Sequence, residues 1–102
     1  MKPKMTRSSG NVFRDLGFPP EEAEHLLLRS TLMTQVLKII ESRGLTQAQA
    51  AKLMGVTQPR ISDLARGKID LFSIDTLVDM LARAGMKVGV TLNPTTRRRQ
   101  VA

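Results

Sequence analysis

The 102-residue sequence contains no cysteine, tryptophan or tyrosine, and three phenylalanines are its only aromatic residues. Without cysteine, a disulfide framework and a thiolate metal site are both excluded. The scarcity of aromatic residues predicts a core of aliphatic side chains. It also argues against an RNA-binding module, because such modules stack unpaired bases on aromatic rings.

Long apolar runs are also missing. No stretch approaches the length of a membrane span, and the basic N-terminus lacks the apolar segment of a signal peptide. We therefore expect a cytoplasmic protein that does not bind a membrane. The length of the chain favours one domain with a modest core.

Groups that could perform catalysis are few. The only histidine, His25, stands beside Glu21, Glu22 and Glu24, and the sequence has no glycine-rich phosphate loop. Carboxylates that follow a pair of prolines are typical of a helix N-terminus, where the helix dipole favours negative charge. A catalytic or metal site is the alternative interpretation of this acidic group. We predict no enzymatic activity, no catalytic residue, no metal site and no cofactor.

Basic charge is the first feature that the sequence has in excess. Sixteen Lys and Arg residues against nine Asp and Glu residues give a net charge of +7. Such an excess favours a polyanionic partner, and nucleic acid is the commonest one. Residues 46–70 carry four basic and two acidic residues, whereas residues 18–45 carry three and four. The basic excess therefore lies in the middle segment and at both ends of the chain.

One stretch in that middle segment predicts two short helices joined by a tight turn. Thr46 and Gln49 have the spacing of a capping box, which begins the first helix. Gly55 supplies the left-handed backbone conformation that turns the chain. In the second helix Ile61 and Leu64 face inward, so the polar residues between them face elsewhere. The alternative is an ordinary helical hairpin whose polar side is only solvated.

Residues 46–67 resemble the helix-turn-helix of the lambda-repressor-like (Xre) family. The motifs that carry the resemblance are LTQAQAA at 45–51, GV at 55–56, ISDL at 61–64 and RG at 66–67. The flanking segments NVFRDLGF at 11–18 and GMKVGVTL at 85–92 resemble HigA-type antitoxins of toxin–antitoxin systems.

This resemblance implies a sequence-specific DNA-binding transcriptional repressor. As an antitoxin, it would also neutralise a RelE/HigB-like ribonuclease toxin and repress the operon that the two share. A stand-alone phage- or plasmid-type repressor with no toxin partner is the alternative.

A helix-turn-helix places the first turn of its second helix in the major groove of double-stranded DNA. There, Gln58 can pair bidentately with adenine, and Pro59 can contact a thymine methyl group. By resemblance to the family, Asp63 also reads a base, and its carboxylate can accept from cytosine. Arg43 is a candidate for an ion pair with Asp63 or another acidic residue.

We expect a second group of polar and basic residues to contact DNA phosphates. For its basic members, the alternative is a solvated surface charge. The predicted phosphate contacts are Gln47, Thr57, Arg60, Ser62, Arg66 and Lys68.

The fold that these patterns predict is all-α, a compact lambda-repressor-like bundle of four to five helices. A long helix is predicted from Pro20 to Arg43, and a last helix from Ser73 to Gly85, with Phe72 in the core. The inward face of the long helix is predicted to comprise Leu28, Leu32, Val36 and Ile39, widened by Leu26, Met33, Leu37 and Ile40. A break in this helix near Ser30–Thr31 is the alternative.

A β-strand is predicted over residues 86–92. Its apolar side would be formed by Met86, Val88, Val90 and Leu92, which alternate with polar or small residues. A lone strand needs a partner. The candidates are the same strand of a second subunit, a strand of another protein, or the Val12–Phe13 segment. We expect the first, in a homodimer that binds a palindromic operator, and the alternative is a tail that only covers the domain.

The predicted domain spans residues 11–93. A disordered basic tail is expected at 1–10 and a flexible basic tail at 94–102. In the second tail, Arg97–Arg99 are either solvated or add phosphate contacts.

Overall fold

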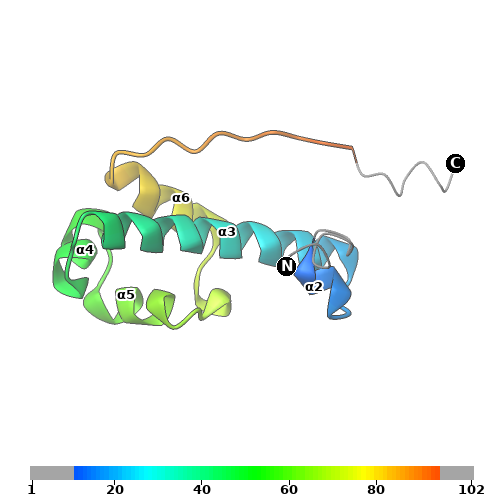
Figure 1. Ribbon diagram of the computed structural model, residues 1–102, viewed down its shortest axis with the longest axis horizontal. Helices are drawn as coiled ribbons and strands as arrows, with labels where there is room; N and C mark the ends of the chain where they lie inside the picture. Colours follow the sequence, from blue (N-terminus) through cyan, green and yellow to red (C-terminus); the bar gives the residue numbers. More distant parts are fainter. Residues whose placement is uncertain (1–10, 95–102) are drawn as a thin grey trace, which may run out of the picture.

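The computed structural model describes residues 11–94, which form helices packed around the long helix α3 (Figure 1). In chain order the elements are α2 (Val12–Asp15), α3 (Pro20–Ser42), α4 (Gln47–Met54), α5 (Gln58–Ala65), the 3-10 helix η1 (Ile69–Leu71) and α6 (Ile74–Arg83). The predicted all-α class is confirmed. Over the same residues, no helix combines the length and the apolar composition needed to cross a bilayer.

The central helix α3 begins at the predicted residue, continues without a break, and ends one residue before the predicted Arg43. Pro20 is its first residue, Glu21 and Glu22 lie in its first turn, and Arg43 closes it after Ser42. Its buried residues are Ala23, Leu26, Leu32, Met33, Val36 and Ile39. The prediction of its inward face is wrong for Leu28, whose side chain is 46% exposed. The prediction is confirmed for Leu26 and Met33, which are buried on the same face as Leu32, Val36 and Ile39.

The core lies between α3, α4, α5 and α6. Phe72, between η1 and α6, is its largest fully buried side chain, with 1% of its surface exposed, so its predicted core position is confirmed. Ser73 caps α6, since its hydroxyl accepts a hydrogen bond from the Thr76 amide at 3.1 Å. The other buried members are aliphatic, as the composition predicts: Leu32, Met33, Val36, Ile39, Ala50, Ala51, Met54, Ile61, Leu64, Leu77, Met80, Leu81 and Ala84.

The short helix α2 is held against α3 by Asn11. The Asn11 side chain accepts a hydrogen bond from the Phe13 amide at 2.9 Å and donates one to the Ala23 carbonyl at 3.1 Å. One amide side chain thus caps α2 and fixes it to the first turns of α3. The possibility that Val12–Phe13 pairs with a C-terminal strand is wrong, because these residues are helical.

The β-strand predicted over 86–92 is also wrong, since within residues 11–94 the structure contains no strand. After α6 the chain runs back alongside α3 (Figure 1). Strands form through hydrogen bonds to another extended segment, but the neighbours of this segment are helices, whose backbone groups already bond within the helix. Val88 packs against the core, whereas Val90 and Leu92 are 81% and 88% exposed.

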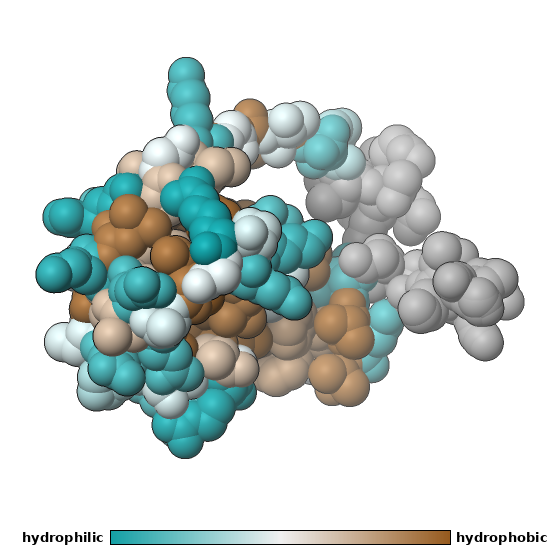
Figure 2. Space-filling view, turned by 60° about the vertical axis from the view of Figure 1, so that its left-hand side comes forward, coloured by the Kyte–Doolittle hydropathy of each residue, from teal (hydrophilic) through white to brown (hydrophobic). Residues whose placement is uncertain are grey.

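Part of this C-terminal segment stands clear of the helical body (Figure 2). A cavity of about 550 Å³ lies between the segment and the side chains of α3 and α6. The tails predicted at 1–10 and 94–102 lie outside the described residues, apart from Pro94, and so do Arg97–Arg99.

Candidate nucleic-acid interface

The capping box predicted at the start of α4 is present. The Thr46 hydroxyl accepts from the Gln49 amide at 3.1 Å, and the Gln49 side chain accepts from the Thr46 amide at 2.8 Å. Two backbone donors that the helix itself cannot satisfy are therefore bonded. Behind this cap, Ala50 and Ala51 are buried, and their small side chains let neighbouring helices approach α4 closely.

The turn between α4 and α5 depends on Gly55. Its φ of +73° is in the left-handed region that favours glycine, as predicted. Thr57 is the N-cap residue of α5 but makes no side-chain capping bond, and Pro59 occupies the first turn, where proline is tolerated. The short turn sets α5 at a fixed position against α4.

The two faces of α5 differ sharply in burial. Ile61 and Leu64 are fully buried in the core, while Gln58 and Pro59 are exposed at the start of the helix. Figure 1 shows α5 on the opposite side of α3 from the C-terminal segment. The polar first turn of α5 therefore faces outward and is not covered by the rest of the described chain.

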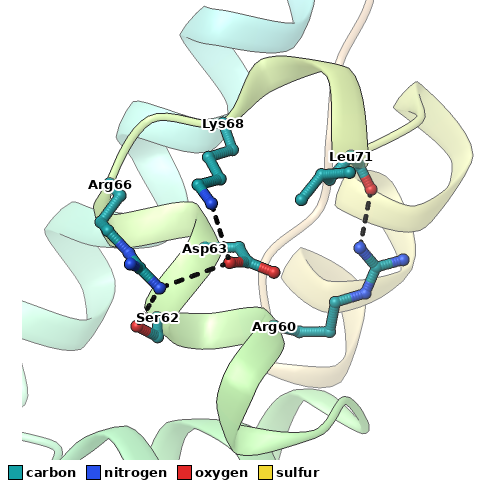
Figure 3. A network of polar contacts seen from close by, with 6 residues as sticks. All are labelled: Arg60, Ser62, Asp63, Arg66, Lys68 and Leu71. Atoms are coloured by element: carbon teal, nitrogen blue, oxygen red, sulfur yellow. Dashed lines mark hydrogen bonds and ion pairs between the residues drawn. The ribbon is translucent and has the colours of Figure 1, made fainter.

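A network of polar contacts links the second half of α5 to the loop that follows it (Figure 3). The Asp63 carboxylate lies 3.6 Å from the Arg66 guanidinium and 3.9 Å from the Lys68 ammonium group. Arg66 also donates a hydrogen bond to the Ser62 hydroxyl at 3.3 Å. Two cations thus surround one anion, which leaves this corner of the surface positive. The candidate ion pair between Arg43 and Asp63 does not form, because Arg43 donates to the Ala84 carbonyl at 2.9 Å.

Arg60 has a different environment from its basic neighbours. Its Nη1 donates a hydrogen bond to the Leu71 carbonyl at 2.9 Å, which Figure 3 also shows. Its guanidinium carbon lies 5.2 Å from the centre of the Phe72 ring, within the range of a cation–π interaction. Neither contact could be predicted from the sequence, since Leu71 lies 11 residues further along the chain.

The sequence over residues 12–93 matches a family of helix-turn-helix domains. The chain belongs to that family. It is also 29% identical, over 83 residues, to a protein of Haemophilus influenzae named as an uncharacterized HTH-type transcriptional regulator; the match covers 81% of this chain and 84% of the relative. In the helix-turn-helix, α4 is the first helix and α5 is the recognition helix, which in this class of motif reads DNA. Family and relative together support a DNA-binding regulator.

The predicted base-reading residues all lie on the recognition helix. Gln58 and Pro59 share its exposed first turn, whereas Asp63 lies near its end within the ion-pair network. The predicted phosphate contacts surround these positions. Gln47 and Thr57 are exposed at the starts of α4 and α5, Ser62 and Arg60 are half-buried on the recognition helix, and Arg66 and Lys68 are exposed just after it. The helix-turn-helix thus gathers nine residues of the sequence prediction into one region, from 47 to 68.

Proposed function

We propose that the protein is a sequence-specific transcriptional repressor that inserts α5 into the major groove of its operator. The observation that carries this proposal is the division of α5 into a buried apolar face and an exposed polar first turn. The buried Ile61 and Leu64 anchor the helix to the core, so its polar first turn is presented to the outside. The name of the Haemophilus influenzae relative, a transcriptional regulator, supports the same role.

Base recognition is assigned first to Gln58. Its amide has both a donor and an acceptor, which match the adenine edge in the major groove. Pro59 beside it supplies an apolar surface for a thymine methyl group. Arg66 and Lys68 both approach Oδ1 of Asp63, so its second carboxylate oxygen can accept from cytosine. Both ion pairs are near the surface and contribute at most about 1 kcal/mol, so DNA can replace them.

Phosphate contacts are assigned to the groups around the recognition helix. Arg66 and Lys68 provide two cations directly after α5, and the polar side chains of Thr57 and Ser62 lie on α5 or at its start. Gln47 is the first residue of α4, where the positive end of the helix dipole favours an anion. These contacts fix the register of the protein on DNA without reading its sequence.

We also propose that the protein binds as a homodimer to a palindrome with half-sites roughly 34 Å apart. The segment after α6 supports this proposal. Val90 and Leu92 expose most of their apolar surface, and no element of residues 11–94 pairs with their backbone. The same segment of a second copy would cover this apolar surface.

Binding to the DNA upstream of the protein's own coding sequence tests the repressor role. We expect tight binding to a palindromic fragment and much weaker binding to random duplex, with affinity for both falling steeply from 50 to 200 mM salt. Analytical ultracentrifugation of the complex should give two protein chains per palindrome. Equal affinity for every sequence at all salt concentrations would contradict the proposal.

The antitoxin role rests on the resemblance of residues 11–18 and 85–92 to HigA-type antitoxins. The α2 region adds a structural reason, because Val12, Leu16 and Phe18 expose apolar surface there that a RelE-like toxin could cover. Figure 2 shows apolar surface at the end of the molecule where α2 lies.

Co-expression with the neighbouring gene tests this role. We expect a small basic protein to co-purify and its toxicity to be suppressed. A Leu16→Asp variant should lose the partner but keep DNA binding, while an Arg14→Gln variant two residues away lowers the net charge by the same single unit and provides the control. If no protein co-purifies and the chain still binds its operator, the stand-alone repressor is favoured.

A further inference from the structure

We propose that Arg60 is a positioning residue, which fixes the orientation of the recognition helix instead of contacting DNA. This inference rests on the proposed function, because it concerns how α5 is held for reading bases. Two contacts carry it. Arg60 Nη1 donates to the Leu71 carbonyl at 2.9 Å, and the guanidinium lies over the ring of Phe72 at 5.2 Å from its centre.

Both contacts connect α5 to the rigid part of the domain. Phe72 is fully buried, so its ring is fixed by the core. Leu71 ends the 3-10 helix η1, and the last carbonyl groups of a helix have no partner within it. Arg60 satisfies one of these carbonyls, and the same guanidinium lies over the Phe72 ring. A guanidinium can do both, since its N–H donors lie in the plane and its face remains free.

The recognition helix needs such a contact because it is short. It has eight residues and two fully buried anchors, Ile61 and Leu64, which lie on one side of the helix. Anchors on one side oppose separation of α5 from the core more strongly than they oppose rotation of α5 about its own axis. A rotation of about 20° would move a side-chain atom on the outer surface, about 5–6 Å from the axis, by about 2 Å. Hydrogen bonds tolerate only a few tenths of an ångström, so such a rotation would misplace the Gln58 amide.

The other cations of the region lack this arrangement. Arg66 and Lys68 are 61% and 49% exposed, and their partners are the half-buried side chains of Asp63 and Ser62. Their side chains can turn toward a phosphate at little cost. Arg60 would have to leave both the carbonyl and the ring to do the same. We therefore assign Arg66 and Lys68 to the phosphates and Arg60 to the orientation of α5.

Two substitutions at Arg60 separate positioning from phosphate contact. Arg60→Lys keeps the charge but not the planar group, and Arg60→Gln removes the charge. Arg66→Gln serves as the phosphate-contact comparison, and Lys38→Gln on the exposed face of α3 controls for the loss of one positive charge. Affinities for operator and random duplex are measured by fluorescence anisotropy across a range of salt concentrations, and thermal denaturation gives the folded fraction.

We expect both Arg60 variants to lose at least about fivefold in operator affinity, which is the lower limit for one bidentate base contact. Arg60→Gln should match Lys38→Gln in its affinity for random duplex and in its salt dependence. Arg60→Lys should match the unaltered protein in both quantities. Arg66→Gln should instead weaken both duplexes alike and reduce the salt slope by about 1. The proposal would be overturned if Arg60→Lys kept the operator preference of the unaltered protein. It would also be overturned if Arg60→Gln, like Arg66→Gln, weakened binding to both duplexes alike and reduced the salt slope.

A second measurement needs no DNA and so separates this inference from the proposed function. Backbone amide chemical shifts of the free, folded Arg60→Lys protein should change throughout the first turn of α5, including Gln58, and not in α2. Shifts confined to residue 60 and its sequence neighbours at 61 and 62 would show that Arg60 does not orient the helix. If the unaltered protein shows no sequence preference, the repressor proposal fails while this result still stands.

Discussion

Replacing Gln58 with alanine removes the proposed base contact and leaves the domain intact. Gln58 is the first residue of α5, its side chain is exposed, and within residues 11–94 that side chain makes no hydrogen bond. The free energy of unfolding should therefore change by less than about 0.5 kcal/mol. A bidentate amide–adenine pair is worth about 1–3 kcal/mol of discrimination, so operator affinity should fall by about 5- to 150-fold.

The assay is an anisotropy titration with the operator, with operators changed at one adenine at a time, and with random duplex. Gln58→Ala should bind two operators equally well: the unaltered one, and the one changed at the adenine that Gln58 contacts in the unaltered protein. Gln35→Ala, which removes an exposed amide from α3, is the matched control and should bind like the unaltered protein. An equal loss on operator and random duplex would refute the base-reading role of Gln58.

Three further substitutions test the support of the recognition helix. Thr46→Ala removes the capping box of α4 and should lower the free energy of unfolding by about 0.5–2 kcal/mol in urea denaturation; an unchanged midpoint would show that the cap contributes nothing. Leu64→Ala opens a cavity beneath α5 and should cost about 2–5 kcal/mol by calorimetry, whereas a cost below about 1 kcal/mol would contradict its place in the core. Asp63→Asn releases Arg66 and Lys68, and should change stability by less than about 1 kcal/mol while strengthening binding to random duplex at low salt. If random binding does not rise, the two cations do not contact phosphates.

The helix-turn-helix could be predicted from the sequence because its determinants are local. A capping box spans four residues, the left-handed turn needs one glycine, and the inward positions of α5 follow helical spacing. The structure confirms the features at Thr46, Gly55 and Ile61. Each of these depends on the residue type and its near neighbours, which the sequence shows directly.

Features that depend on contacts between distant residues could not be predicted. Asn11 caps α2 and also bonds to Ala23, 12 residues away, and no sequence spacing indicates that pair. Arg60 reaches Leu71 only because η1 turns the chain back toward α5. The strand at 86–92 was predicted from alternation alone, but alternation identifies the apolar side of an extended segment and does not supply a partner for its backbone.

The central claim is that the first turn of α5 lies in the major groove. Because the sequence has no cysteine, a Thr57→Cys variant carries a single thiol at the start of α5, to which a DNA-cleaving iron chelate can be attached. A Lys87→Cys variant places the same reagent on the C-terminal segment, on the other side of α3. Strong cleavage within each operator half-site from residue 57, and little from residue 87, is the predicted result. Cleavage from residue 87 with none from residue 57 would contradict it.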